Sequence, residues 1–221
     1  MDRHSGGGRT GSASEMGGEA ATLHLRSTDR VLRRLIDGLP PLDEAARRND
    51  RASDPYGSLL RAIVGQQLSV KAGRTIYRRM LDLFAGRVPT PRQLLDADPE
   101  AIRAAGLSRP KITYLRDLAD RVEHGELALE RLGDLPDDDV REQLVAVKGL
   151  GRWTADMFLM FHLRRPDVLP VGDLGIRRAV ERTYLLEEIP DAPTLQGIAE
   201  PWRPHRSTAC LYLWHSLDAT P

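Results

Sequence analysis

The stretch that decides the fold is Leu144-Val-Ala-Val-Lys-Gly-Leu-Gly-Arg-Trp-Thr-Ala155. One amphipathic helical pattern ends at Gly149-Leu-Gly151, and a second helical pattern begins directly after it. Two glycines at this spacing allow a tight turn and a close approach of the backbone to another molecule. The second helix presents unpaired N–H groups and a positive dipole end, which suit a phosphate. Taken alone, the glycines are more typical of an ordinary corner between two helices.

The rest of the chain also carries helical patterns, and runs with the alternation of a strand are missing. Three dipeptides place a capping residue before a proline at the first helical position: Asp54-Pro55, Thr90-Pro91 and Asp98-Pro99. Three glycines stand where helices should end: Gly106, Gly125 and Gly149. We therefore predict an all-α fold.

The expected helices follow from these signals and from the spacing of apolar residues. Helices are predicted over 55–66, 91–96, 99–105, about 110–123 and 154–163. Four more are predicted to start at Asp137 and Asp173 and after caps at Ser69 and Ser207, the last running to Trp214.

Length and composition set outer limits on the class of protein. A chain of 221 residues has room for one large domain or two small lobes. The single cysteine, Cys210, excludes an internal disulfide and a cysteine-based zinc or iron–sulfur site, and it favours a reducing compartment. Because no apolar run approaches the roughly 20 residues that span a bilayer, no association with a membrane is expected.

The first 22 residues are rich in glycine and serine and lack the apolar core of a secretory signal. We predict that residues 1–22 form a disordered tail and that residues 23–221 form the helical domain. The formal net charge is zero, whereas nucleic-acid-binding domains are often basic. Charge alone therefore does not favour a nucleic-acid partner, although local placement matters more than the sum.

Considered as a whole, the pattern around Gly149 and Gly151 resembles the helix–hairpin–helix motif of DNA repair proteins. In that family the hairpin binds the backbone of duplex DNA without reading its sequence, as phosphate contacts do. The resemblance implies DNA contacts at the hairpin and the following turn, from Lys148, Gly149, Gly151 and Thr154. It also implies that hairpin carbonyls hold a monovalent cation, Na⁺ or K⁺, when DNA is bound; motif alignment gives Val145, Val147 and Gly149.

Downstream lies Leu169-Pro-Val-Gly-Asp-Leu-Gly-Ile-Arg-Arg178. In the glycosylase branch of this superfamily, a Gly/Pro-rich loop about 20 residues after the hairpin ends in an aspartate, and Asp173 occupies that place. The residues after it resemble the DNA-3-methyladenine glycosylase II group. Cleavage of an N-glycosidic bond leaves positive charge on the sugar, which a carboxylate stabilises directly or by deprotonating water. Without the hairpin, Asp173 would be interpreted as a plain helix cap.

Members of the superfamily with lyase activity use a lysine two residues after the second glycine of the hairpin. Trp153 occupies that position here, so no Schiff base is expected to form there. The resemblance therefore implies a monofunctional enzyme that uses water and requires no cofactor.

Two further segments match the same group. Leu60-Arg-Ala-Ile-Val-Gly-Gln-Gln-Leu-Ser69 resembles the region that fills the gap left by a flipped nucleotide, with Gln67 as the wedge and Ser69 as a further DNA contact. Residues 202–214 resemble the segment that closes the fold. The family's aromatic base pocket aligns with Trp153 and Trp214, and Met157 replaces a third aromatic residue.

These resemblances imply a monomeric, two-lobed helical glycosylase with the active-site cleft between its lobes and no N-terminal β domain. Its expected role is release of alkylated bases such as 3-methyladenine and 7-methylguanine from duplex DNA in base excision repair. The alanine- and arginine-rich composition suggests a bacterial protein, located in the cytoplasm at the nucleoid.

Three other interpretations explain the sequence less well. A non-catalytic DNA-binding module would have no need of Asp173, and part of the class that acts on oxidised or mismatched bases would carry lysine in place of Trp153. A helical scaffold without nucleic acid would leave the ordered set of motifs unexplained.

Overall fold

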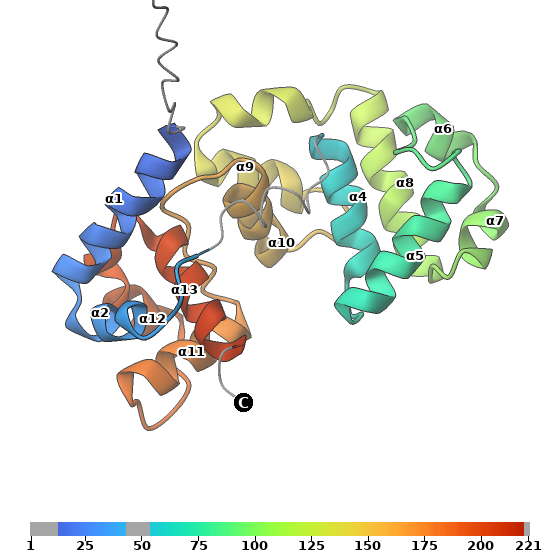
Figure 1. The fold of residues 1–221 in the computed structure, drawn as a ribbon. Helices are drawn as coiled ribbons and strands as arrows, with labels where there is room; N and C mark the ends of the chain where they lie inside the picture. The colour runs from blue at the N-terminus through green and yellow to red at the C-terminus, as the bar shows by residue number, and fades with distance from the viewer. Residues whose placement is uncertain (1–12, 43–53, 219–221) are drawn as a thin grey trace, which may run out of the picture. The chain divides into compact units, whose positions relative to one another are not determined.

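The computed structural model describes residues 13–42 and 54–218. Over these residues the chain is helical and contains no strand, so the prediction of an all-α fold is confirmed (Figure 1). Two compact units divide the described residues. Unit 1 combines residues 13–42 with 166–218, and unit 2 is the continuous stretch 54–165. The predicted cleft between two lobes stays a prediction.

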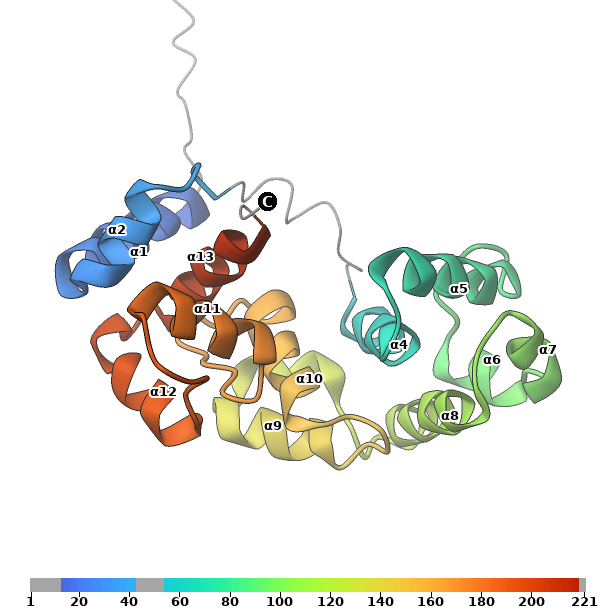
Figure 2. The same ribbon diagram turned by 90° about the horizontal axis from the view of Figure 1, so that it is seen from below.

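Unit 1 packs helices from both ends of the chain around one apolar core. Its helices are α1 (Ala13–Thr28), α2 (Arg30–Asp37), α11 (Leu174–Tyr184), α12 (Ala192–Ile198) and α13 (Arg206–Asp218), with a 3₁₀ turn at Glu200–Trp202. Helices α1, α2, α11 and α13 lie against one another (Figures 1 and 2). Asp29 links the two parts of the chain, because its carboxylate caps α2 and accepts hydrogen bonds from Tyr184 and Trp202.

Unit 2 is built from short helices in sequence order. They are α4 (Pro55–Gly65), α5 (Val70–Asp82), α6 (Pro91–Asp96), α7 (Pro99–Ala104), α8 (Arg109–Glu123), a 3₁₀ segment (Leu129–Asp134), α9 (Asp137–Val145) and α10 (Arg152–Met157), which continues as a π-helix (Phe158–His162). Helix α8 packs on α4, α6 and α7, so it lies at the centre of this unit (Figure 1).

The predicted helix starts are largely confirmed, because their signals are local. Asp54, Ser69, Thr90, Asp98 and Asp173 each cap a helix with the side chain, and Thr90 and Gln93 form a complete capping box. Gly106, Gly125 and Gly149 all adopt positive φ angles, as expected of residues that end helices.

Two expectations were wrong within the described residues. Residues 13–22 belong to α1, where Ala21 is buried, because the helix gains a partner in α2 and α13; residues 1–12 of the predicted tail lie outside the described residues. Ser207 does not cap the last helix, which begins at Arg206. The Ser207 hydroxyl instead accepts a hydrogen bond from the backbone N–H of Val168 at 3.0 Å.

No helix among the described residues is long and apolar enough to cross a membrane.

Candidate active site

Asp173, the predicted catalytic residue, is held firmly at the start of α11. Its side chain accepts a hydrogen bond through Oδ1 from the backbone N–H of Ile176 at 2.8 Å. The same oxygen accepts a hydrogen bond from Nε1 of Trp214 on α13 at 3.0 Å. Asp173 is only 9% exposed. Asp173 and Trp214, predicted separately for chemistry and for the base pocket, are therefore direct partners within unit 1.

The loop that leads to Asp173 is fastened to the start of α13. Arg206 donates from Nε to Oδ1 of Asp167 at 2.7 Å and from Nη2 to the Asp167 carbonyl at 2.8 Å. The backbone N–H of Ser207 donates to the carbonyl of Pro166, while its hydroxyl accepts from Val168. The Arg206-Ser207 pair of the closing segment thus positions the loop, and Trp214 of the same helix then contacts its last residue.

Gly175 is a site residue that our sequence analysis missed. A Cβ atom at this position would lie 3.0 Å from Oδ1 of Asp173 and 3.2 Å from Nε1 of Trp214, closer than such atoms normally approach. Glycine therefore allows the indole of Trp214 to come against the start of α11. The only signal in the sequence is the Asp-Leu-Gly order, which has no meaning until Trp214 is known to lie there.

The two hairpin glycines differ in what they do. Gly149 has a φ of 80° and a Cβ atom there would overlap the ring of Tyr114, so the free protein needs glycine at this position. Gly151 has a φ of −102°, and a Cβ atom there would meet nothing within 4 Å. Its missing side chain leaves open space directly before α10, whose first turn has no side-chain cap.

Lys148 lies on the exposed side of the hairpin and is paired with Asp117 of α8. Its Nζ lies 3.2 Å from Oδ1 of Asp117, and its backbone N–H donates to Oδ2 at 2.9 Å. Burial alone would raise the pKa of Asp117, but these hydrogen bonds and that from Arg121 lower the pKa below its usual value. Asp117 is therefore a stable anion that holds the hairpin backbone.

The predicted wedge lies in a short loop between α4 and α5, residues 66–69, which we call the wedge loop. Gln67 is exposed and adopts a φ of 57°, an unusual conformation for a residue with a side chain. Ser69 closes the loop by capping α5 through the N–H of Ala72. Its hydroxyl is therefore used within the chain, as a helix cap, in this structure.

The side chains predicted beside the second hairpin helix have different exposures. Trp153 is 48% exposed, Met157 is half-buried and Thr154 is only 6% exposed. A direct DNA contact of Thr154 would thus have to use its backbone. Asp156 of the same helix accepts a hydrogen bond from Arg141 at 2.7 Å. Burial raises the pKa of Asp156 above its usual value, although the interaction with Arg141 acts to lower it.

The carbonyls predicted for a cation are partly engaged. The Val147 carbonyl accepts from the N–H of Leu150 at 3.1 Å, and the Gly149 carbonyl accepts from Nε2 of Gln66 at 2.8 Å. Each carbonyl oxygen has two lone pairs, so one hydrogen bond leaves capacity for a cation. Among the described residues, no group of three histidine, cysteine or acidic side chains is arranged to bind a metal ion.

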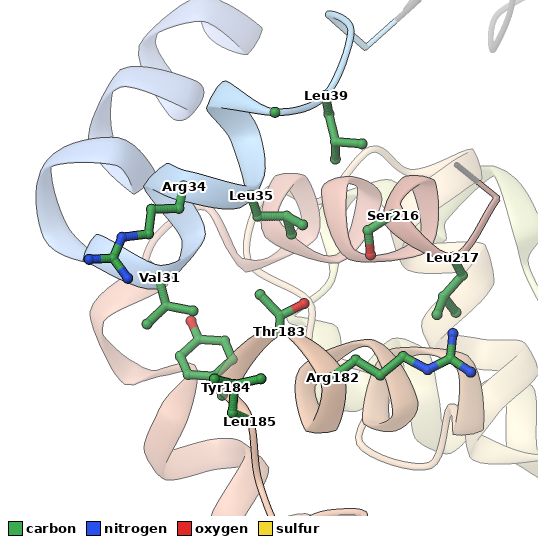
Figure 3. A pocket seen from close by; sticks show the side chains of 11 residues that line it. Val31, Arg34, Leu35, Leu39, Arg182, Thr183, Tyr184, Leu185, Ser216 and Leu217 are labelled. Carbon is green, nitrogen blue, oxygen red and sulfur yellow. The ribbon is translucent and has the colours of Figure 1, made fainter. Parts of the chain in front are cut away.

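A hollow of about 600 Å³ in unit 1 lies elsewhere, between α2, α11 and α13 (Figure 3). Val31, Leu35 and Leu217 give it an apolar lining, and Arg34 and Arg182 stand at its edge. None of the residues predicted for catalysis, the base pocket or DNA binding lines it.

Comparison with known proteins identifies relatives over most of the chain. Residues 60–204 match the family described as HhH-GPD superfamily base excision DNA repair protein. DNA-3-methyladenine glycosylase 1 of Schizosaccharomyces pombe is 34% identical over 196 residues, which are 88% of this chain and 85% of the relative. DNA-3-methyladenine glycosylase 2 of Escherichia coli is 29% identical, and the match covers 74% of this chain but 58% of that relative.

Solved structures show the same fold. The S. pombe 3-methyladenine DNA glycosylase in complex with abasic DNA has a TM-score of 0.78 and 33% identity, covering 91% of this chain and 98% of that one. A DNA-3-methyladenine glycosidase from Bacillus halodurans has a TM-score of 0.75 and 36% identity, covering 95% of this chain and 91% of that one.

Proposed function

Because the chain belongs to the HhH-GPD superfamily of base excision DNA repair proteins, we propose that it is a DNA glycosylase that releases alkylated bases from duplex DNA. The observation that supports this chemistry is the placement of the Asp173 carboxylate. Its Oδ1 accepts hydrogen bonds from Ile176 and Trp214, and the residue is nine-tenths buried. A protein that only binds DNA has no use for such an anion.

Asp173 is the proposed catalytic residue. Cleavage of the bond between base and sugar develops positive charge at C1′, and a fixed carboxylate stabilises this charge without having to reorganise. The same group can accept a proton from the attacking water. The two hydrogen bonds to Oδ1 fix the orientation of the carboxylate before the nucleotide arrives.

The aromatic side chains of Trp153 and Trp214 are proposed to contact the flipped base, and Met157 is proposed as a third residue of the base pocket. Many alkylated purines carry a positive charge, and the face of an indole attracts a cation by about 0.5–2 kcal/mol. Such bases also leave readily, so the site needs no strong acid to protonate them. We propose 3-methyladenine and 7-methylguanine as the substrate type.

The hairpin and the wedge loop are the proposed DNA contacts. Gly149 and Gly151 allow the phosphate backbone to approach the N–H groups at the start of α10, and Lys148 adds a positive charge. Ser69, which caps α5, would contribute a further DNA contact through the start of that helix. Gln67 would fill the gap left by the flipped nucleotide. The Val145, Val147 and Gly149 carbonyls would hold a Na⁺ or K⁺ ion, which would supply positive charge at the hairpin for phosphate binding.

The test of the proposed function is incubation of the purified protein with methylated duplex DNA, followed by chromatography of the released bases. We expect free 3-methyladenine and 7-methylguanine, and far less of either in the same time from an Asp173→Asn variant. Release of 8-oxoguanine instead, from duplexes that contain it, would assign the protein to the glycosylases for oxidised bases. Tight binding to these duplexes without release of any base would make it a DNA-binding module.

We further propose that the enzyme is a monomer without lyase activity. Trp153 stands at the second residue of α10 and carries no amine that could form a Schiff base. Borohydride should therefore trap no covalent complex with abasic DNA, and the product strand should stay intact. Trapping in stoichiometric yield would show that another amine, such as that of Lys71, Lys111 or Lys148, acts as a nucleophile.

A further inference from the structure

Helix α8 touches both proposed DNA-contacting loops of unit 2 with side chains spaced three residues apart. Lys111, Tyr114 and Asp117 lie on one side of this helix. Tyr114 and Asp117 hold the hairpin, through ring contact with Gly149 and a hydrogen bond from the Lys148 N–H. Lys111 contacts the wedge loop instead. The functions proposed above give no role to this contact.

The Lys111 ammonium group binds the end of α4 directly before the wedge residue. Its Nζ donates to the carbonyl of Val64 at 2.8 Å and to the carbonyl of Gln66 at 2.6 Å. These carbonyls belong to the negative end of the α4 dipole, where a cation is favourable. Burial disfavours the charged form of Lys111 and therefore lowers its pKa. The two carbonyl acceptors replace hydrogen bonds that the ammonium group would otherwise make to water.

A second contact joins the two loops to each other. Gln66 donates from Nε2 to the carbonyl of Gly149 at 2.8 Å, although the two residues are 83 positions apart. The backbone of Gln66 is thus held by Lys111 while its side chain holds the hairpin. Gln67, the next residue, is exposed and constrained to a positive φ.

We propose that Lys111 and Gln66 form a clamp that fixes the wedge loop relative to the hairpin, making Lys111 a positioning residue for Gln67. The clamp rests on the proposed function and extends it to a residue outside the family motifs quoted above. The clamp therefore keeps Gln67 at a fixed position relative to the hairpin that binds the phosphate backbone. Without it, the hairpin would still bind DNA, but Gln67 would enter the stack less often.

The variants are chosen to separate the clamp from folding. Lys111→Met keeps the length of the side chain and removes its donors, and Lys111→Arg restores charge and donors. Gln66→Met breaks only the contact with Gly149 and serves as a second, milder disruption. Arg92→Met on the exposed surface of α6 is the matched control, since it removes the same charge outside the clamp and outside both loops. The melting temperature of each variant verifies that it folds.

The kinetic test is single-turnover excision of 7-methylguanine from a duplex with one lesion. We expect Lys111→Met to slow excision about tenfold, since small misplacements of a positioning group have effects of this order or larger. Lys111→Arg should recover most of the rate, Gln66→Met should lose part of it, and Arg92→Met should stay within about twofold. Affinity for undamaged duplex should change little, because Tyr114 and Asp117 still hold the hairpin.

The decisive measurement is the coupling between Lys111 and Gln67. If Lys111 acts through the wedge, Gln67→Ala should slow the wild type clearly but have almost no further effect in Lys111→Met. A general loss of stability would instead multiply the two effects. Multiplicative losses, or a wild-type rate for folded Lys111→Met, would overturn the clamp.

A binding readout keeps this test separate from that of the proposed function. The probe is a duplex with a tetrahydrofuran abasic analogue opposite 2-aminopurine, whose fluorescence rises when its stacking is broken. Wild type should raise the fluorescence at saturation, and Lys111→Met should raise it much less. An equal rise with both would overturn the clamp. Failure of wild type to release any methylated base would refute the proposed function but leave this fluorescence comparison valid.

Discussion

In unit 1 the proposed catalytic group is a side chain, whereas the hairpin of unit 2 is proposed to contact DNA mostly through its backbone. Asp173 is 9% exposed and receives hydrogen bonds from two elements of its own unit. At the hairpin, Gly151 faces open space and α10 begins without a side-chain cap. The difference agrees with the two proposed functions, catalysis in unit 1 and DNA binding at the hairpin. Chemistry at one carbon atom needs a single charge in a fixed place, while a grip on any DNA sequence needs groups that approach a phosphate.

Substitutions around Asp173 in unit 1 should therefore affect the excision rate, whereas a side chain that fills the open space at Gly151 in unit 2 should affect affinity for DNA. The four predictions below test this division, beginning with the largest expected effect.

Asp173→Asn should lower the single-turnover excision rate by about 100- to 1000-fold, the usual loss when a fixed group that stabilises charge is removed. Asparagine keeps an oxygen for the Ile176 N–H and the Trp214 indole, and it caps helices as well as aspartate. Affinity for abasic DNA and the melting temperature should thus stay near the wild-type values. Excision at a near-normal rate would remove Asp173 from the chemistry.

Gly175→Ala should slow excision by about 10- to 100-fold, because the added methyl group displaces the Trp214 indole or the Asp173 carboxylate. Binding to undamaged duplex should not change. Gly172→Ala, in the loop directly before α11, is the matched control, since a Cβ atom there would meet nothing within 4 Å. Equal rates for the two variants would show that the approach of Trp214 to α11 is irrelevant to the reaction.

The two hairpin glycines should respond in opposite ways. Gly151→Val should weaken binding to damaged and undamaged duplexes alike, by about tenfold if contacts worth about 1.4 kcal/mol are lost, with an unchanged melting temperature. Gly149→Ala should lower the melting temperature by roughly 5 °C, because it opposes a positive φ and overlaps Tyr114. A loss of affinity confined to lesion-containing DNA in Gly151→Val would contradict the proposed role of the hairpin.

The smallest expected effect separates two functions of Trp214. Trp214→Phe keeps an aromatic face but loses the hydrogen bond to Asp173, so it should slow excision of charged and neutral bases equally. Trp214→Ala should add a further loss of about three- to tenfold on 7-methylguanine but not on neutral hypoxanthine. Matched duplexes with one lesion each provide the comparison. An identical profile for both variants would mean that the indole only positions the carboxylate.

The features that could be predicted from the sequence are those encoded within a few residues. The caps at Asp54, Thr90 and Asp98 and the turn at Gly149 are local, and the structure has them where the sequence predicted them. The family motifs added the order of the hairpin and the aspartate loop, and the matching superfamily confirmed that resemblance.

The features that sequence analysis missed depend on contacts between distant segments. Ser207 looked like a cap but binds Val168, 39 positions away. Gly175 matters only because Trp214 approaches it, and Lys148 is paired with Asp117 of α8. No periodicity in the sequence reports such partners. Residues 13–22 were predicted as a tail because the glycines around them have low helix propensity, and packing of α1 against α2 and α13 overrides this.

The discontinuity of unit 1 has a consequence for how the protein is made. Helices α1 and α2 are synthesised first, but their packing partners in α11 and α13 are added only after all of unit 2. Unit 2 is continuous in sequence, so it can complete its core on the ribosome before α11 and α13, the packing partners of α1 and α2, have been synthesised. The part proposed to grip DNA would then form before the corner that holds Asp173. During synthesis the nascent chain would gain affinity for DNA earlier than the capacity to cut a glycosidic bond.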